Sequence, residues 1–268
     1  MIRYLCARLS RWAVAVIAAG AAATPAWACG PYRVVFYEYG SMYMLNPAGS
    51  GSGVDKDVLD EVARRTGCKF VPSVASRVAT WAYMTRGVAD ITVSSIRTPE
   101  RERMAAFAIY LKGSVTLYVR AELAATIDSL HSFVSQGAWT LAVVKGFSYG
   151  PVLDAVVEDL RKRGRVVEYA DAKVATRIIG LGRADALLAF PLAWEPLFKA
   201  ERLEDRVAAV ATPGVPPAEA GLALSRERVS ERDIQRMTQA VADMRADGTL
   251  TRILERYGAP EIARRALP

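Results

Sequence analysis

One stretch of the sequence, from Gly87 to Phe107, is GVADITVSSIRTPERERMAAF. Its apolar residues 89–93 predict a short buried strand, and Thr98 followed by Pro99 predicts the N-cap and first residue of a helix. Arg101 would then lie in the first helical turn, where free backbone N–H groups, the helix dipole and a guanidinium all favour a carboxylate. The stretch predicts an anion-binding corner centred on Arg101. The alternative interpretation is a capped surface helix with solvated charges.

The N-terminus has the pattern of a secretory signal peptide. Three arginines precede an apolar run at 12–23, and Ala26 and Ala28 provide the small residues that a signal peptidase requires. The run has 12 residues, which is too short to cross a bilayer of roughly 30 Å as a helix. We therefore predict a signal peptide at 1–28 and a soluble mature chain in the periplasm.

Charge and composition exclude several classes of function. Removal of the three arginines before residue 28 lowers the formal net charge from +7 to +4, and the sequence has no basic stripe with interleaved aromatics, so we expect no nucleic-acid partner. His131 is the only histidine, which excludes a histidine metal cluster and makes a Ser-His-Asp triad improbable. No Gly-Lys-Ser/Thr motif follows the glycine-rich loop at 46–53. We predict a monomer without metal ion or cofactor.

The two cysteines that follow the predicted signal peptide are Cys29 and Cys68. An even pair in an oxidising compartment predicts a disulfide, which would destabilise the unfolded chain by roughly 4 kcal/mol. Lipidation of Cys29, which would be the first mature residue, is the alternative, although residues 26 and 27 match a lipoprotein signal poorly. Two free thiols are the third possibility.

A repeated pattern predicts two similar α/β lobes. The words RVAT at 77–80 and GVAD at 87–90 are echoed by KVAT at 173–176 and GRAD at 182–185, and each pair is typical of a helix, a glycine stop and a strand. The predicted lobe 1 comprises 29–112 plus 219–268, and the predicted lobe 2 comprises 113–218. The chain would cross between the lobes twice, near 110–118 and 213–223.

Apolar periodicity supplies the elements of both lobes. The predicted strands are 34–39, 69–74, 89–93, 139–144, 166–169 and 184–190. The predicted helices are 54–66, 151–162, 174–181, 231–246 and 250–257. The last two would complete lobe 1.

Five words in order carry a resemblance across nearly the whole mature chain. They are GVDKDV at 53–58, GVAD at 87–90, TPER at 98–101, GRAD at 182–185 and MRADGT at 244–249. Together they resemble the family 3 bacterial extracellular solute-binding proteins. The resemblance implies a two-lobe periplasmic-binding-protein (Venus-flytrap) fold with two hinge crossings. It also implies capture of a small solute, most often an amino acid, for the membrane permease of an ABC importer.

The resemblance also implies a ligand site between the lobes. Arg101 matches the arginine that grips the ligand's α-carboxylate in this family. The other implied ligand-binding residues are Ser94, Ser95, Ser148, Tyr37, Tyr39, Trp81 and Phe190. For the aromatic residues of the first lobe, core packing is an equal alternative.

Two departures leave the function open. The spacing from Asp90 to Arg101 is one residue shorter than in common amino-acid binders and resembles sensor modules as much as transport proteins. Phe190 stands where those binders place the acid that receives the α-ammonium, so either Glu195 or another acid reaches in, or the ligand has no amino group. The alternatives to transport are a cyclohexadienyl-dehydratase-like periplasmic enzyme, which the turn at 145–150 does not match, and a component that presents its ligand to a sensor.

Overall fold

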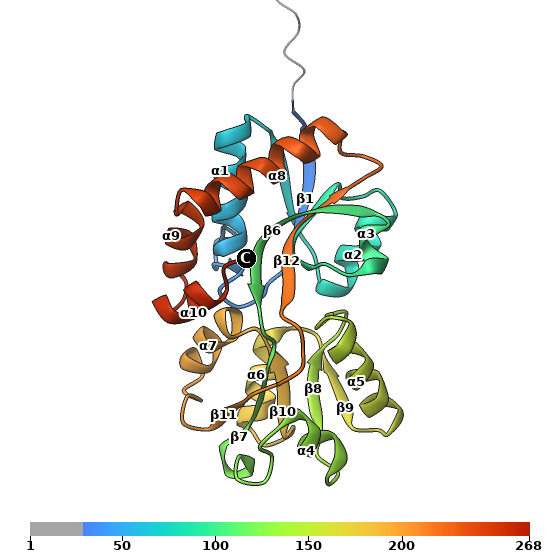
Figure 1. Ribbon diagram of the computed structural model, residues 1–268, viewed down its shortest axis with the longest axis vertical. Helices are drawn as coiled ribbons and strands as arrows, with labels where there is room; N and C mark the ends of the chain where they lie inside the picture. Colours follow the sequence, from blue (N-terminus) through green and yellow to red (C-terminus); the bar gives the residue numbers. More distant parts are fainter. Residues whose placement is uncertain (1–28) are drawn as a thin grey trace, which may run out of the picture.

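The computed structural model describes residues 29–268. The predicted signal peptide at 1–28 lies outside the described residues. Within the described part, no helix has the length and apolar character needed to cross a membrane. Figure 1 shows two α/β lobes stacked along the long axis of the molecule.

Lobe 1 is built on a five-stranded sheet of order β4-β1-β5-β12-β6. Strand β1 pairs in parallel with β4 and β5, whereas β12 runs antiparallel to β5 and β6. These strands are β1 (Tyr32–Phe36), β4 (Phe70–Val74), β5 (Ile91–Ile96), β6 (Ala105–Gly113) and β12 (Ala218–Ser225). The helices of this lobe are α1 (Val54–Thr66), α2 (Arg77–Thr85), α3 (Pro99–Glu102), α8 (Glu231–Ala246), α9 (Thr249–Glu255) and α10 (Pro260–Arg265).

Helix α1 illustrates why the sequence specifies these elements. Acidic residues lie in its first turn and basic residues in its last, which complements the helix dipole. Gly67 ends the helix in the left-handed conformation, with φ 71°. Val58 and Val62, one turn apart, are fully buried on the face that packs in the lobe 1 core.

Lobe 2 repeats the architecture on a sheet of order β11-β7-β10-β8-β9. Its strands are β7 (Thr116–Arg120), β8 (Leu141–Val144), β9 (Val166–Tyr169), β10 (Ala186–Ala189) and β11 (Val207–Val210). Its helices are α4 (Leu130–Ser135), α5 (Pro151–Lys162), α6 (Ala172–Gly180) and α7 (Pro191–Ala200), with a 3-10 turn at Ala121–Leu123. A separate hairpin of β2 (Met44–Leu45) and β3 (Gly51–Ser52) extends from lobe 1.

Two segments cross between the lobes, one from β6 to β7 and one from β11 to β12 (Figure 1). Gly113 and Ala218 pair on neighbouring strands where the crossings leave lobe 1. The predicted two-lobe fold with two crossings is thus confirmed. The exact lobe boundaries at 112/113 and 218/219 stay a prediction.

The repeated sequence pattern has the same structural role in each lobe. The Asp90 carboxylate accepts a hydrogen bond from the backbone N–H of Arg33 at 2.9 Å. It also forms an ion pair with the guanidinium of Arg33 at 2.6 Å. Asp185 accepts from Thr140 N at 2.8 Å and pairs with Arg120 at 3.0 Å. Each aspartate therefore ties the start of its own strand to a neighbouring strand of the same sheet.

Cys29 and Cys68 form a disulfide whose Cα atoms lie 4.5 Å apart. The predicted pairing is confirmed, and it joins the chain just before β1 to the chain just before β4. Since the Cys29 sulfur is used in this bond, the structure favours the disulfide over the lipid anchor and over two free thiols.

Several boundaries differ from the sequence prediction. Strand β1 ends at Phe36 rather than at 39, because the chain turns there and Tyr39 N donates to Tyr43 O at 3.0 Å. The glycine-rich stretch predicted as a loop contains β3 of the hairpin. Helix α3 has only four residues before β6 begins at Ala105. Thr98 caps this short helix, Pro99 begins it and Arg101 lies in it, as the sequence predicts. Anion binding at this helix entrance stays a prediction.

Candidate ligand-binding site

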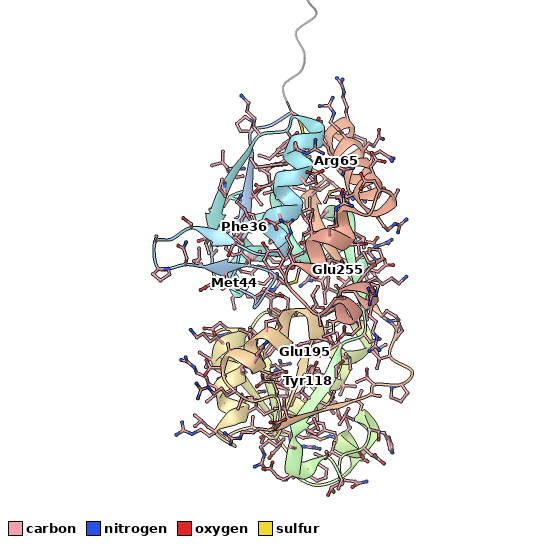
Figure 2. All side chains as sticks on the ribbon, turned by 90° about the vertical axis from the view of Figure 1, so that its left-hand side faces the viewer. Phe36, Met44, Arg65, Tyr118, Glu195 and Glu255 are labelled. Carbon is pink, nitrogen blue, oxygen red and sulfur yellow. A yellow bond between two sulfur atoms is a disulfide. The ribbon has the colours of Figure 1, made fainter. Side chains whose placement is uncertain are left out.

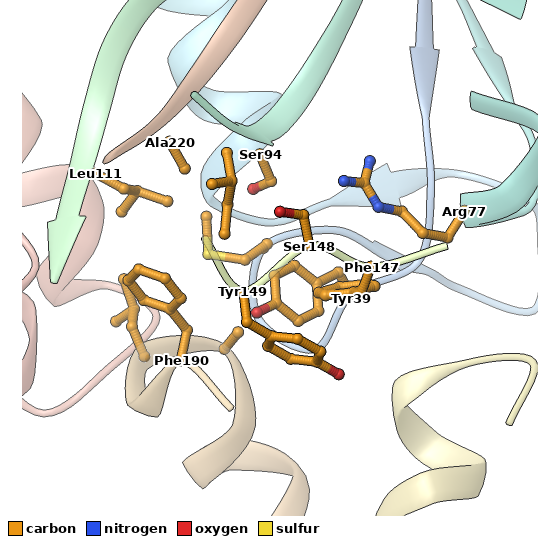
Figure 3. Close-up of a pocket in the computed structure, with 13 residues that line it drawn as sticks. Tyr39, Arg77, Ser94, Leu111, Phe147, Ser148, Tyr149, Phe190 and Ala220 are labelled. Carbon is orange, nitrogen blue, oxygen red and sulfur yellow. The ribbon is translucent and has the colours of Figure 1, made fainter. Parts of the chain in front are cut away.

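A pocket lies where the two lobes meet (Figure 3). Its volume is about 20 Å³, which is room for about one water molecule. Lobe 1 contributes Tyr39, Met42, Arg77, Ser94, Ile96, Leu111 and Ala220, and lobe 2 contributes Phe147, Ser148, Tyr149, Phe190, Leu192 and Ala193. Among the described residues this lining contains one charged side chain, Arg77, and no carboxylate.

The lobes touch directly around this pocket. The ring of Phe147 in lobe 2 packs edge-on against Tyr39 in lobe 1, with centroids 4.7 Å apart. Ser41 Oγ in lobe 1 donates to Leu192 O at the start of α7, at 2.6 Å. The pocket is small because these aromatic rings fill the space between the lobes.

Arg77 is the first residue of α2 and is held there by the Ser76 cap, whose hydroxyl accepts from Ala79 N. Its guanidinium carbon lies 4.4 Å from the ring centroid of Tyr37 and 5.2 Å from that of Phe147. The residue is only 4% exposed. Its Nε and Nη1 atoms have no hydrogen-bond partner among the described residues. Since a buried donor without a partner costs free energy, this guanidinium is suited to an anion.

Ser94 occupies a strained position at the edge of the pocket. Its φ of 41° is in the left-handed region, which is unusual for serine and common at functional sites. The conformation is fixed by hydrogen bonds on three sides. Ser94 N donates to Tyr110 Oη at 2.8 Å, Ser94 O accepts from Tyr37 Oη at 3.0 Å, and Ser94 Oγ donates to Asp55 Oδ1 at 2.8 Å.

Asp55 on α1 lies behind Ser94 and is fully buried. Burial raises the pKa of its carboxyl to about 7, and the hydrogen bonds from Tyr110 and Ser94 and the charge of Arg77 oppose that rise. Its Oδ2 atom has no partner among the described residues. The carboxyl is therefore a neighbour of the pocket that supports Ser94 without lining the pocket itself.

Arg101 lies beside the pocket rather than in its lining. Its Nη1 donates to Ile96 O at 2.9 Å, and its guanidinium carbon lies 4.5 Å from the ring centroid of Trp81. Burial, and after it the charge of Arg77, lower the pKa of Arg101 to about 10. Two cationic side chains of lobe 1 thus lie close to one another at this end of the pocket.

The lobe 2 side is formed by the turn before α5. Ser148 Oγ donates to Asp154 Oδ2 at 2.6 Å, and Tyr149 N donates to Asp154 Oδ1 at 2.7 Å. Asp154 therefore fixes the turn and keeps the Ser148 hydroxyl at the pocket wall. Burial raises the pKa of Tyr149, so its phenol stays neutral.

The structure places four of the predicted site residues in the pocket lining: Ser94, Ser148, Tyr39 and Phe190. The other four, Ser95, Tyr37, Trp81 and Arg101, lie outside it. Tyr37 and Trp81 lie under the two guanidinium groups, whereas Ser95 Oγ donates back to Val93 O at 3.3 Å. Ligand contact by any of the eight stays a prediction.

Glu195 is not brought into the pocket. It accepts a hydrogen bond from Tyr118 Oη at 3.3 Å in lobe 2 (Figure 2), and burial raises the pKa of its carboxyl. It lines two grooves of about 600 Å³ each that lie between α7 and α10. Phe190 stands at the pocket instead, so the predicted acid from this part of lobe 2 is replaced by an aromatic ring.

Sequence reasoning missed Arg77 and Phe147 as site residues. The sequence contained a signal for Arg77, because a basic residue in the first turn of a helix is repelled by the helix dipole. Such a residue is expected there only where it has an interaction that offsets the repulsion. Phe147 carried no comparable signal, since an aromatic residue in a turn is equally typical of packing.

The sequence model of one protein family, the bacterial extracellular solute-binding proteins, family 3, matches residues 34–260. No curated protein sequence matches the chain. Among solved structures, a histidine kinase sensor domain with similarity to periplasmic binding proteins superposes with a TM-score of 0.72 at 13% identity, over 85% of this chain and 96% of that one. A putative L-cystine ABC transporter protein from Listeria monocytogenes gives 0.71 at 16% identity, over 88% and 98%.

An ancestral arginine-binding protein bound to arginine gives a TM-score of 0.68 at 18% identity, over 84% of this chain and 97% of that one. Identities this low show the shared fold alone. The family match, in contrast, covers most of the chain, including α1, the strand before Arg101 and both crossings. The chain therefore belongs to the bacterial extracellular solute-binding proteins, family 3.

Proposed function

We propose that the protein captures a small carboxylate-bearing solute between its two lobes and delivers it to the permease of an ABC importer. The observation that supports this most is the guanidinium of Arg77, which lies in the pocket lining with two nitrogen atoms that lack a partner. A carboxylate would accept hydrogen bonds from both nitrogens and balance the charge.

The lining also bears on which carboxylates fit. An α-amino acid brings an ammonium group, which needs an anionic or several neutral acceptors when it is buried. The described lining residues include no Asp or Glu, and Phe190 stands on the lobe 2 side. An organic acid therefore fits this pocket better than an amino acid, although the similar ancestral arginine-binding protein was solved with arginine bound.

Capture requires the lobes to separate. A pocket of about 20 Å³ does not hold a solute of several heavy atoms while Phe147 packs against Tyr39. Opening about the two crossings, followed by closure over the solute, is the hinge motion that fits a two-lobe molecule with two connecting strands.

A thermal-shift screen of organic acids and amino acids tests this function. A ligand at about 100 times its dissociation constant would add roughly 2.7 kcal/mol to the free energy of unfolding, which is easily measured. Failure of every organic acid and amino acid to stabilise the protein would contradict the proposal. Uptake of the identified ligand by cells with and without the gene then tests the importer role.

A second candidate is a component that presents its ligand to a sensor. It is supported by the similarity to a histidine kinase sensor domain. If ligand uptake does not change on deletion of the gene while a ligand-dependent signalling output is lost, this second function replaces transport.

We propose no catalytic role. The described pocket lining contains no Asp, Glu, His, Lys or Cys, and His131 is exposed on α4 in lobe 2. A general acid and base pair has no residues there. Incubation with prephenate, followed by a search for phenylpyruvate, tests this. Formation of phenylpyruvate would show that the protein is an enzyme.

A further inference from the structure

We infer that the solute is a dicarboxylate, with one carboxylate held by Arg77 and the other by Arg101, and that it carries no ammonium group. This inference rests on the proposed function and names the substrate class of the same pocket. It depends on the positions, partners and charges of the two arginines and on the groups that surround them.

The donor edge of Arg77 is available to a ligand. The face of its guanidinium is covered by the rings of Tyr37 and Phe147, which fixes its orientation without using its N–H groups. Figure 3 shows the guanidinium extending toward the region between Ser94 and Ser148. Asp55 lies nearby, but no ion pair joins it to Arg77 among the described residues, and burial favours the neutral form of its carboxyl. Arg77 is therefore a fixed donor that lacks an acceptor.

Arg101 has the same arrangement on the neighbouring side. One face lies over Trp81, and a single carbonyl, Ile96 O, accepts from Nη1. A guanidinium has five N–H donors, so four remain for other acceptors. Ile96 itself lines the pocket, which places Arg101 directly beside that wall. A ligand that reaches past Ile96 as the lobes open would contact it.

The charge of Arg77 lowers the pKa of Arg101, so the two cations repel one another, and the described pocket lining contains no carboxylate. Asp154 outside the lining offsets part of this effect, and no ion pair joins Asp154 or Asp55 to either arginine among the described residues. Asp154 is tied to the turn of lobe 2 by Ser148 and Tyr149, and Asp55 is held by Tyr110 and Ser94. A monocarboxylate would neutralise one arginine and leave the other without a partner. A dicarboxylate would neutralise both and bring no additional cation into the pocket.

Isothermal titration with the wild-type protein tests the inference. The probes are malonate, succinate, glutarate and adipate, each compared with the monocarboxylate of equal chain length, and glutarate is also compared with glutamate. Because a hydrogen bond between two charged groups is stronger than one between neutral groups, we expect the best dicarboxylate to bind at least about tenfold more tightly than its monocarboxylate. We also expect glutarate to bind more tightly than glutamate.

Two variants locate the two carboxylates. Arg77→Gln and Arg101→Gln should each lower dicarboxylate affinity to about that of the monocarboxylate, with a smaller effect on the monocarboxylate for at least one of them. Arg86→Gln and Arg103→Gln are matched controls, because these exposed arginines lie on or next to the same helices. Thermal unfolding of each variant without ligand shows that it is folded.

The outcomes separate the two proposals. If monocarboxylates bind as tightly as dicarboxylates, the dicarboxylate inference is overturned and the proposed function stands. If glutamate or another amino acid binds more tightly than every dicarboxylate, the absence of an ammonium group is overturned. If no carboxylate binds at all, the proposed function fails as well.

Discussion

The two faces of the interlobe pocket differ in kind. The lobe 1 face has the charge, with Arg77 in the lining, Arg101 beside it and Asp55 behind Ser94. The lobe 2 face presents three aromatic rings and Ser148. The nearby acid, Asp154, accepts a hydrogen bond from Ser148 and stabilises the turn before α5. Under the proposed function, lobe 1 would select a ligand by charge before closure, and lobe 2 would supply apolar area.

We expect the largest effect from removing the charge of Arg77 in lobe 1. Arg77→Met should lower the affinity for the best dicarboxylate to about that of its monocarboxylate, at a loss of about 2–3 kcal/mol, because one of two charged contacts is lost. The ligand-free variant should unfold at a temperature equal to or above that of the wild type, because an unpaired buried cation has been removed. Titration and thermal unfolding measure the two effects. Unchanged affinity would show that lobe 1 does not select by this charge.

The next effect concerns the pH dependence of stability. The pKa of Asp55 is raised from 3.8 in the unfolded chain to about 7 in the folded protein. The folded state therefore keeps a proton that the unfolded state releases, so the stability from this group is full below pH 4 and is lost as the pH rises toward 7.

Replacement of Asp55 by Asn should remove that loss. The free energy of unfolding of Asp55→Asn relative to wild type should rise between pH 5 and 7, by up to about 2 kcal/mol. Asp60→Asn on the same helix, at an exposed site, is the control. Parallel curves for Asp55→Asn and wild type in urea titrations at each pH would contradict the raised pKa.

A smaller effect should follow from adding charge to lobe 2. Phe190→Glu places a carboxylate where an ammonium group of an amino acid could be received, and it should shift the preference from glutarate toward glutamate by about 1–2 kcal/mol. Phe190→Leu, which changes size without charge, should leave the ratio of the two affinities near that of the wild type. If Glu and Leu variants give the same ratio, the side chain at this position does not set the preference.

The smallest effect concerns the aromatic contact between the faces. Phe147→Ala removes the ring that packs against Tyr39 and should make the ligand-free protein more open, with a gain in ligand affinity of about 1 kcal/mol or less, since less contact is broken on opening. Small-angle scattering measures the radius of gyration. Phe198 is a buried ring of α7 outside the pocket. Phe198→Ala should therefore lower the free energy of unfolding and leave the radius of gyration unchanged.

The sequence predicted the fold more closely than the site. Helices at 54–66, 151–162 and 231–246 begin and end as their apolar period and capping residues indicate. Those signals are local. The site depends on contacts between segments far apart in the chain, such as Phe147 against Tyr39 and Arg77 over Tyr37. Residue patterns do not show such pairs, which is why Arg77 and Phe147 were not predicted as site residues.

One contact links the crossings to the pocket. Gly113, where β6 leaves lobe 1, lies so close to Phe190 that a Cβ atom there would come within 3.1 Å of the ring. This contact places one crossing strand directly against a ring of the pocket lining. If the lobes rotate about the crossings as proposed, the surroundings of that ring would change, and a fluorine label on Phe190 would report the change.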